Sequence, residues 1–414
     1  MKWTHTVVIG AGQAGLAMSR CLSDRAIAHV VLERGRVAER WRTERWDSLR
    51  LLTPNWLSRL PGFRYEGPDP DGYMTMPDVV DYLERFARFA DAPVAERTAV
   101  TRVERYGSGF RVETTGGTWR SANVVVATGY CDEPVIPAFG AGLTDDITQT
   151  VPTRYRNPSK LPPGGVLIVG ASASGVQLAD ELRAAGRDVV IAVGRHTRLP
   201  RTYRGKDILW WLDVMGMLGA SADDVFDLEV SRHQPSLQLV GRPDRRTLDL
   251  GVLRAQGVRI VGRLLAAEGE RVRFDDDLFA TTAAADAKLA TLIARIDAFV
   301  EKGGLTGSVE PPEPFTPLWP QFTSPVPATL DLKAEGIGTV LWATGFRRRY
   351  PWLAVPVLDL NGEIRHTGGV TPIEGLYVIG LTFLRRRNSA FIDGVGGDAR
   401  ELADHIAKRR GAAA

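Results

Sequence analysis

The sequence predicts an α/β protein made of two units of similar design, and three observations support this. An apolar run, a glycine-rich turn, a helical stretch and a second apolar run follow one another in residues 7–35. The same order returns in residues 164–201. Two more apolar stretches, 123–130 and 339–346, each end in Ala-Thr-Gly and an aromatic residue. A glycine-rich turn between strand and helix is typical of nucleotide-binding sheets, so we expect two Rossmann-like dinucleotide-binding domains.

The composition indicates a large globular protein rather than a nucleic-acid-binding one. A chain of 414 residues exceeds what one hydrophobic core usually serves, which favours two or three domains. Its 52 basic and 49 acidic side chains leave a net charge of +3. Binding to nucleic acid would need a clustered basic face, so we expect no nucleic-acid partner. The short run Arg385–Arg387 is interpreted as solvated surface.

Cysteine content and hydropathy indicate where the protein works. Cys21 and Cys131 are the two cysteines, and they form no C-x-x-C pair and no zinc-ligand spacing. We therefore expect no metal site and a reducing, cytoplasmic environment. The first apolar strand begins within a few residues of Met1, which leaves no room for a secretion signal. The most apolar stretch, 208–220, is short and contains Asp213, so we expect no membrane span.

The first glycine turn has the spacing G-x-G-x-x-G. Gly10 permits the tight turn, Gly12 lets the backbone approach a pyrophosphate, and Gly15 lets the helix pack closely on the strand. The second strand ends at Glu33, whose carboxylate can accept hydrogen bonds from ribose hydroxyls and would repel a 2′-phosphate. The alternative is a purely structural turn, which the full strand–turn–helix–strand order disfavours. The residues expected to bind this nucleotide are Gly10, Ala11, Gly12, Gln13, Ala14, Gly15, Glu33 and Arg34.

The second glycine turn differs from the first at its middle position and at the strand that follows. Ser172 replaces the middle glycine between Gly170 and Gly175. Where the first unit has a carboxylate, the second has Gly194 followed by cationic side chains, which favours NADPH over NADH. The alternative reading is that these cations are ordinary surface charges. The residues expected to bind this coenzyme are Gly170, Ser172, Ala173, Ser174, Gly175, Arg195, His196 and Arg198.

The paired Ala-Thr-Gly motifs and the C-terminal segment provide further candidate contacts. Glycine at such a strand end permits backbone close to a bound nucleotide while the chain crosses between domains. Residues 391–406 read as a glycine-rich turn followed by an amphipathic helix whose N-terminus could face a bound ring. The candidates from these segments are Ala127, Thr128, Gly129, Thr344, Gly345 and Asp393.

With these motifs, the chain resembles the two-dinucleotide-domain flavoproteins, and within them the class B flavin-containing monooxygenases, including their plant auxin-synthesis branch. The resemblance covers nearly the whole chain. It implies FAD in the first unit and NADPH in the second, with Trp41, Arg42 and residues 49–55 lining the flavin and Val100 marking the strand beside the adenine. The segments that carry it are GAGQAG (10–15), ERGRVAERWR (33–42), RTERWDSLRLLTP (42–54), YMTMPDVVDYLERFA (73–87), YRNP (155–158), GASASG (170–175) and the two ATG motifs.

The resemblance also implies a reaction. NADPH reduces FAD, dioxygen adds to the flavin to give a C4a-hydroperoxide, and this species oxygenates a small organic substrate that carries a nucleophilic heteroatom or a carbonyl. Thr53 or Asn55 approximately matches the active-site asparagine of that family. Val151 stands where the family carries a histidine before the YRNP tyrosine. Two alternatives therefore remain open: an NADPH oxidase or flavin reductase that releases peroxide, and a flavin-binding redox sensor. The lack of paired cysteines disfavours a disulfide reductase.

The motifs divide the chain into an FAD-binding domain, residues 1–153 and 336–414, and an inserted NADPH-binding domain, residues 154–335. Within the latter, residues near 282–328 form a helical and Pro-rich insertion. Its apolar stripe is interpreted as simple packing or, alternatively, as the wall of a substrate channel. The tryptophan-containing stretch within 204–220 could cap an entrance or form a homodimer contact.

Overall fold

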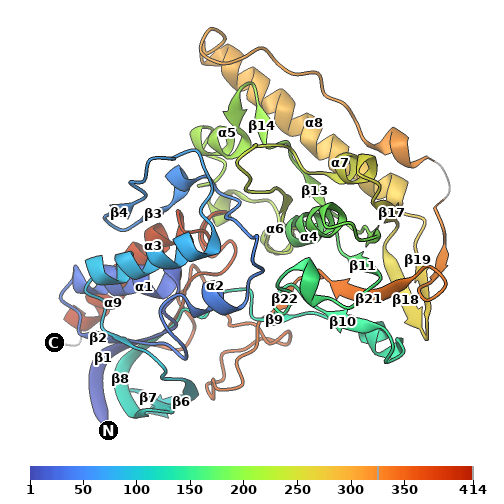
Figure 1. Ribbon diagram of the computed structural model, residues 1–414. Helices are drawn as coiled ribbons and strands as arrows, with labels where there is room; N and C mark the ends of the chain where they lie inside the picture. Colours follow the sequence, from blue (N-terminus) through green and yellow to red (C-terminus); the bar gives the residue numbers. More distant parts are fainter. Residues whose placement is uncertain (324–325, 413–414) are drawn as a thin grey trace.

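The computed structural model describes residues 1–323 and 326–412. Its first sheet is the core of the lower-left part of Figure 1 and has the strand order β5-β2-β1-β8-β7-β6, with β23 also paired to β8. The strands are β1 (Lys2–Ile9), β2 (His29–Leu32), β5 (Val94–Ala95), β6 (Val100–Tyr106), β7 (Gly109–Thr114), β8 (Gly117–Val126) and β23 (Leu376–Val378).

Parallel pairing in this sheet explains its apolar sequence. β1 pairs in parallel with β2 and β8, and β23 pairs in parallel with β8. Parallel strands are covered on both faces, and Val7, Val8 and Val125 accordingly have no exposed surface. Helix α1 (Gln13–Ser23) packs against the C-terminal helix α9 (Val395–Ala412), while α3 (Met76–Phe89) begins at a capping box formed by Thr75 and Asp78.

The second sheet is entirely parallel and has the order β10-β21-β11-β12-β17. Its members are β10 (Thr148–Thr150), β11 (Gly165–Val169), β12 (Val189–Ala192), β17 (Arg259–Val261) and β21 (Ile337–Trp342), and its helices include α4 (Ala173–Ala184) and α7 (Leu250–Ala255). The predicted α/β class with two Rossmann-like units is confirmed. The predicted boundaries need a correction, because β10 and β21 lie outside residues 154–335 yet pair within the second sheet.

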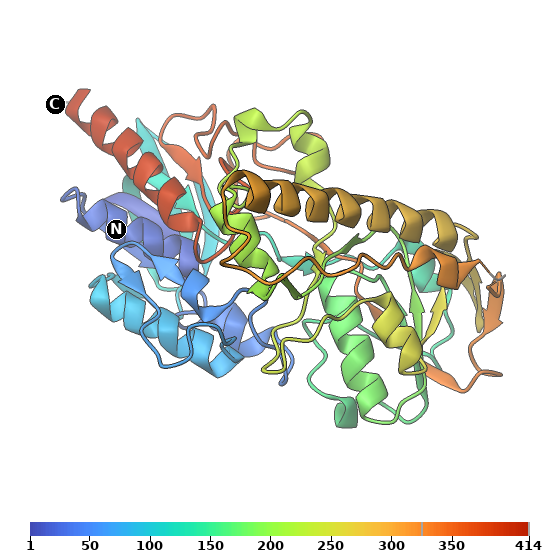
Figure 2. The same cartoon turned by 90° about the horizontal axis from the view of Figure 1, so that it is seen from above.

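The insertion forms an outer layer on the second unit. Strands β18 (Leu264–Glu268) and β19 (Arg271–Phe274) come before helix α8 in the sequence, and β20 (Thr329–Asp331) comes after it. The three strands form one antiparallel sheet. The helix spans Leu278–Lys302 and so begins before the expected residue 282. In Figure 2, α8 (gold) lies along one side of the second unit, with its C-terminal end beside α5 (Ile208–Val214). Ile296 and Val300 of α8 are buried in one cluster with Trp211 of α5, which agrees with the packing interpretation of the apolar stripe.

The remaining elements are short. They are α2 (Glu39–Thr43), α6 (Leu228–Arg232), β3 (Arg59–Leu60), β4 (Phe63–Arg64), β9 (Glu133–Pro134), β13 (Thr197–Arg198), β14 (Thr202–Tyr203), β15 (Lys206–Asp207), β16 (Leu237–Gln238), β18 (Leu264–Glu268), β19 (Arg271–Phe274), β20 (Thr329–Asp331), β22 (Phe346–Arg347) and the 3-10 turns η1 (Asn55–Leu57), η2 (Ala138–Gly142), η3 (Pro158–Lys160), η4 (Ala222–Asp224) and η5 (Trp319–Phe322).

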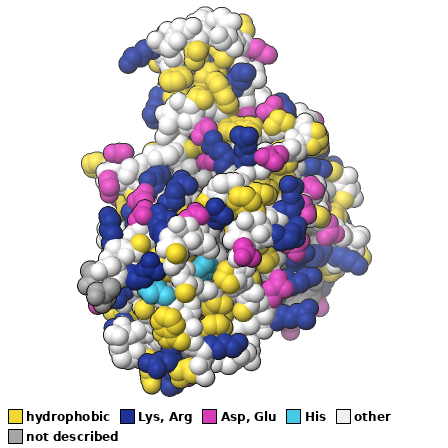
Figure 3. Space-filling model, turned by 90° about the vertical axis from the view of Figure 1, so that its left-hand side faces the viewer, with side chains coloured by type: hydrophobic (Ala, Val, Ile, Leu, Met, Phe, Trp, Pro, Cys, Tyr) yellow, Lys and Arg dark blue, Asp and Glu magenta, His cyan; other side chains and the backbone are white. Residues whose placement is uncertain are grey.

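The surface mixes both signs of charge. Figure 3 shows Lys and Arg side chains interspersed with Asp and Glu over the face that it draws. The two signs of charge are therefore intermixed on this face. Across residues 1–323 and 326–412, no helix combines the length and the apolar composition that crossing a membrane requires.

A buried arginine joins the two units. The guanidinium of Arg201, only 1% exposed, donates to the carbonyl of Leu52 at 2.8 Å and to the Asp207 carboxylate at 2.5 Å. It also lies over the ring of Tyr73, and the Tyr73 hydroxyl donates to the same carboxylate at 2.9 Å. Leu52 and Tyr73 belong to the first unit and Asp207 to the second. A charged network that is shielded from water thus fixes how the units meet.

We expect Arg201→Met to lower the free energy of unfolding by about 3–5 kcal/mol, because it leaves the Asp207 carboxylate without its charged partner. Urea unfolding followed by circular dichroism measures this. Asp213→Asn is the matched control, because its 3.4 Å ion pair with Arg59 is exposed and should contribute less than about 1 kcal/mol. Equal effects of the two variants would show that Arg201 is not a special anchor.

Candidate functional site

A cavity of about 880 Å³ lies at the carboxyl ends of β1, β2 and β8 in the first unit. This is where parallel α/β sheets bind their ligands. Its wall combines the first glycine turn and the end of β2 with residues from α2, the first Ala-Thr-Gly motif and the turn before α9. The predicted residues found in the wall are Gly10, Gly12, Gln13, Ala14, Glu33, Arg34, Trp41, Thr53, Val100, Ala127, Thr128 and Gly129.

The three glycines of the first turn have different physical roles. Gly10 has a φ of +108°, and a Cβ there would lie 2.7 Å from the Ala127 carbonyl oxygen. A Cβ on Gly15 would overlap with the carbonyl oxygen of Gly10, so Gly15 lets α1 approach β1. Gly12 has an ordinary φ of −82°, and a Cβ there would meet no protein atom within 4 Å. The fold therefore requires Gly10 and Gly15, whereas Gly12 leaves space for a ligand.

The second glycine turn repeats this geometry. Gly170 has a φ of +106°, and a Cβ on Gly175 would overlap with the Gly170 carbonyl oxygen. Ser172 stands at the N-cap position of α4 with φ −83° and ψ −169°, close to the −82° and −173° of Gly12, and its side chain makes no capping hydrogen bond. That conformation suits any residue, which explains how serine can stand at the middle position.

Glu33 is held in place by backbone amides. The residue is 8% exposed, and its two carboxylate oxygens accept hydrogen bonds from the N–H groups of Ala11 at 2.8 Å and Gly35 at 2.9 Å. Each carboxylate oxygen has a second lone pair, so the group can still accept hydrogen bonds from the hydroxyls of a ribose. The side chain thus fits the adenosine end of an FAD molecule that extends along the cavity.

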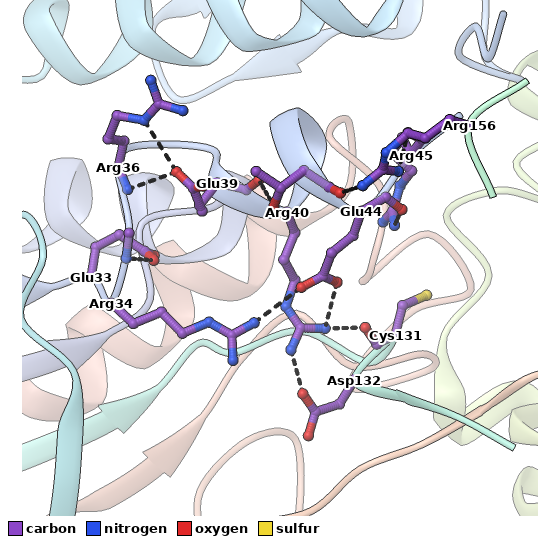
Figure 4. A network of polar contacts seen from close by, with 12 residues as sticks. Glu33, Arg34, Arg36, Glu39, Arg40, Glu44, Arg45, Cys131, Asp132 and Arg156 are labelled. Carbon is purple, nitrogen blue, oxygen red and sulfur yellow. Dashed lines mark hydrogen bonds and ion pairs between the residues drawn. The ribbon is translucent and has the colours of Figure 1, made fainter. Parts of the chain in front are cut away.

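A chain of alternating charges runs along the cavity wall, as Figure 4 shows. Arg34 pairs with Glu44 at 3.1 Å, and Glu44 also lies 3.8 Å from Arg40. Arg40 in turn donates to the Cys131 carbonyl and to the Asp132 carboxylate. This chain connects the end of β2 and α2 with the segment after β8. The sequence reasoning missed Arg40, Glu44 and Asp132. Arg40 and Glu44 are four residues apart, but the pairing of Arg40 with Asp132 joins distant parts of the chain.

Trp41 and the turn before α9 form another part of the cavity wall. The Trp41 indole donates to the Gln13 side chain at 3.3 Å, and the Arg45 guanidinium lies over the indole ring at 5.2 Å. Ala390, Phe391 and Ile392 line the cavity just before α9 begins at Val395. Leu51 and Leu52 add apolar wall. An aromatic and apolar enclosure of this kind fits the ring system of FAD.

Two predicted residues of the first unit, Arg42 and Asp393, have other partners. Arg42 donates to the Val37 carbonyl and pairs with Glu84 of α3. Asp393 binds Arg59 and accepts a hydrogen bond from Asn388 at 3.1 Å. Neither side chain is in the cavity wall. Ala11 and Gly15 lie behind the wall, where they support the turn.

Of the two catalytic candidates, Thr53 and Asn55, one lines the cavity and the other does not. Thr53 lines the cavity. Asn55 is 4% exposed, and its amide oxygen accepts from the Met74 N–H while its amide nitrogen donates to the Asp69 carbonyl, both at 2.8 Å. The prediction for Asn55 is corrected: it joins two loop segments and does not face the cavity.

At the end of β12 in the second unit, two of the side chains predicted to bind the coenzyme as cations have other roles. Arg198 pairs with Asp249 at 2.9 Å and with Asp286 at 2.6 Å, so its charge is already neutralised. His196 is 4% exposed and bonds to the Gly194 carbonyl, and burial lowers its pKa, so it supplies no charge at neutral pH. Arg195 is exposed. Arg263, which sequence reasoning missed, is the residue nearest to the Cβ position of Gly194, at 3.7 Å.

The remaining candidate residues lie where the chain crosses from one unit to the other. Gly129 and Gly345 have positive φ values of +78° and +91°, as expected for the two motif ends. The Thr344 hydroxyl donates to the Val135 carbonyl, joining the two crossings. Val151 is 2% exposed and packs in the second unit's core, while Thr153 and Arg154 line the cavity.

Substitutions in the first turn should separate ligand binding from folding. We expect Gly12→Val to fold like the natural protein but to purify without flavin, because the side chain fills space that only a ligand would occupy. Absorbance at flavin wavelengths and a thermal melt of apoprotein measure the two effects. Gly15→Val should instead lower the melting temperature itself, because its side chain meets backbone. Normal flavin content in Gly12→Val would refute the assignment.

Comparison with known proteins supports the arrangement of two nucleotide-binding units. The family described as pyridine nucleotide-disulphide oxidoreductase matches residues 7–210. A flavin-containing monooxygenase from Stenotrophomonas maltophilia has the same fold, with a TM-score of 0.65 and 20% identity over 99% of both chains. The indole-3-pyruvate monooxygenase YUCCA4 of Oryza sativa is 35% identical over 196 residues, which are 42% of this chain and 44% of that protein.

A bacterial oxidoreductase is similar to this chain over nearly its whole length. The chain is 33% identical over 403 residues to the uncharacterized CzcO-like oxidoreductase of Geobacillus kaustophilus, and the match covers 97% of each protein. The two nucleotide turns and these similarities agree on FAD and a nicotinamide dinucleotide as cofactors. The chain belongs to the CzcO-like oxidoreductases, within the flavin- and pyridine-nucleotide-dependent enzymes.

Proposed function

We propose that the protein is an NADPH-dependent flavoprotein monooxygenase that oxygenates a small organic molecule through a flavin C4a-hydroperoxide. The observation that carries this proposal is the apolar cavity end made by Leu51, Leu52, Phe391 and Ile392, which continues from the nucleotide part of one cavity. Cysteine placement opposes a disulfide reductase: Cys21 is buried, and burial raises the pKa of the Cys131 thiol, which disfavours a reactive thiolate.

The residues of this chain would bind, orient and shield the cofactor. The N-terminus of α1 and the open space at Gly12 suit the pyrophosphate, and Glu33 suits the ribose. Trp41, held by Gln13, would fix the ring in one plane, while the leucine and phenylalanine side chains exclude water. When bound, FAD supplies acceptance of a hydride from the nicotinamide and reactivity with dioxygen.

The preference for NADPH over NADH tests the proposed coenzyme site in the second unit. Arg195 is the exposed cation at the end of β12, and a guanidinium–phosphate contact contributes about 1.5–3 kcal/mol. We expect Arg195→Ala to raise the Michaelis constant for NADPH roughly 10- to 150-fold and to leave the NADH kinetics nearly unchanged. Steady-state assays with both coenzymes measure this.

Arg198→Ala is the control for that experiment. Its partners Asp249 and Asp286 lose their cation, so the variant should be less stable while keeping its relative preference for NADPH. Equal loss with both coenzymes in Arg195→Ala would mean that Arg195 supports the fold. A natural protein that prefers NADH would contradict the proposed NADPH dependence.

No histidine is among the described residues that line the cavity, and this favours an oxidase as the second candidate function. Val151 packs in the core, so the segment between the units presents Thr153 and Arg154 to the cavity instead. We expect the natural enzyme to release peroxide when it consumes NADPH without substrate. The ratio of peroxide formed to NADPH consumed measures this leak, and rapid mixing of the reduced enzyme with oxygen shows whether an oxygenated flavin persists.

Two histidine variants test whether an imidazole in the cavity wall lowers the release of peroxide. Thr153→His places an imidazole in the cavity wall and should lower the peroxide ratio. Val151→His buries an imidazole among apolar side chains, so it should destabilise the protein and leave the ratio unchanged. Tight coupling in the natural enzyme would show that another residue already stabilises the oxygenated state. Immediate reoxidation with stoichiometric peroxide, even with substrates present, would favour the oxidase.

A further inference from the structure

A short segment of the second unit, residues 236–241, lies against the second glycine turn. Its strand β16 pairs in parallel with β13, which follows β12. Ser236 comes directly before β16, and its hydroxyl oxygen accepts a hydrogen bond from the N–H of Ala173 at 3.4 Å. Ala173 is the first residue of α4, and Ser236 is exposed. A hydroxyl that solvent can reach therefore lies at the N-terminal end of α4.

This end of α4 has no cap from its own side chains. Ser172 at the N-cap makes no side-chain hydrogen bond, and the first turn contains no acidic residue. The first N–H groups of a helix have no acceptor within the helix, and together with the helix dipole they favour an anion. A distance of 3.4 Å is long for a hydrogen bond, so the Ser236 oxygen is a weak acceptor here. A phosphate oxygen would be a stronger one.

Gln238 provides an independent sign of a ligand at this turn. Its side chain is fully buried, and its amide nitrogen donates to the carbonyl of Ala171, between the two turn residues Gly170 and Ser172, at 2.7 Å. Its amide oxygen is shielded from solvent and has no hydrogen-bond partner among the described residues. A buried acceptor without a donor is unfavourable. The amide thus lies against the glycine turn with one acceptor free for a hydroxyl.

The segment is held at several points, so these two side chains are positioned rather than loose. Gln177 of α4 donates to the carbonyl of Leu239 at 3.1 Å. At the other end of the segment, a Cβ on Gly241 would overlap with the carbonyl oxygen of Leu51, so the backbones of the two units touch there. Leu51 also lines the flavin cavity. The segment therefore runs from the second glycine turn to the wall of the first site.

We propose that Ser236 and Gln238 bind the ribose–diphosphate part of the nicotinamide coenzyme. This inference rests on the coenzyme site proposed for the second unit, to which it adds two residues. A phosphate oxygen takes over the Ala173 N–H, and the Ser236 hydroxyl, which can donate as well as accept, donates to the phosphate. The free oxygen of Gln238 accepts a hydrogen bond from a ribose hydroxyl. NADPH and NADH share these groups, so both contacts strengthen the binding of either coenzyme.

Calorimetric titration of the flavin-loaded oxidised enzyme with NADP⁺, NAD⁺ and ADP-ribose tests this without turnover. Ser236→Ala should weaken the binding of all three by about tenfold, because a hydrogen bond to a charged group is lost. Ser236→Thr keeps the hydroxyl and should retain most of the affinity. Ser236→Asp should weaken binding roughly 100-fold, because its carboxylate repels the diphosphate.

The melting temperature of the coenzyme-free protein separates binding from folding. A carboxylate is favourable at a helix N-terminus and can accept from the Ala173 N–H. We therefore expect Ser236→Asp to melt at the same temperature as the natural protein or higher, although it binds coenzyme less tightly. A lower melting temperature together with weaker binding would show that Ser236 supports the fold, and this would overturn the proposal.

Ser221→Asp is the matched control. The Ser221 hydroxyl accepts a hydrogen bond from the N–H of Asp223 at 3.2 Å, so this serine also caps a helical turn, η4, earlier in the same stretch of chain. The control should leave the affinities for all three probes unchanged. Equal losses in Ser221→Asp and Ser236→Asp would show a general effect of added charge and would contradict a direct contact by Ser236.

Gln238→Met tests the second contact, because methionine fills similar space without the amide. It should weaken the binding of ADP-ribose about fivefold. An unchanged affinity would overturn the role assigned to Gln238.

The three probes also distinguish this inference from the proposed coenzyme site. A natural protein that binds none of them would refute the coenzyme site itself. Binding that is normal in both Ser236→Ala and Ser236→Asp would refute this inference alone. A loss in Ser236→Ala that is confined to NADP⁺ would assign the hydroxyl to the 2′-phosphate, as expected for Arg195→Ala, and would overturn the contact with the diphosphate.

Discussion

The buried guanidinium of Arg201 is the most shielded of the charges that join the two nucleotide units. Because it is kept from water, its charge depends on the Leu52 carbonyl, the Asp207 carboxylate and the Tyr73 ring together. Leu52 and the adjacent Thr53 form cavity wall. The wall of the first unit is thus positioned by a residue of the second, and the cavity depends on the contact between the units.

The fold and the glycine turns could be predicted because their causes are local. The order of strand, glycine turn and helix is written in fewer than forty consecutive residues of each unit, and the backbone contacts at Gly15 and Gly175 follow from that order alone. The match between Gly12 and Ser172 adds a reason that the sequence could not supply: the backbone at this position is ordinary, so the residue type there reflects the ligand rather than the turn.

The site predictions that need correction share one cause, which is a partner from a distant part of the chain. Arg198 looks like a phosphate ligand until Asp249 and Asp286 are seen beside it. Asn55 looks catalytic until Met74 and Asp69 are seen to use its amide. The run Arg385–Arg387 reads as solvated surface from its sequence, but all three side chains are half-buried, and Arg385 and Arg386 pair with Glu401 of α9. Sequence spacing gives the residue types near a strand end but not which charges are already paired.

The chain of charges from Arg34 through Glu44 and Arg40 to Asp132 has a consequence for how the cofactor is kept. Arg40, Glu44 and Asp132 are each about one-quarter exposed or less, so salt can screen their contacts only in part. These contacts join two segments of the wall to each other rather than to the ligand. They therefore set the shape of the cavity wall, so the time for which the flavin stays bound can depend on this wall separately from the affinity that the glycine turn and Glu33 provide.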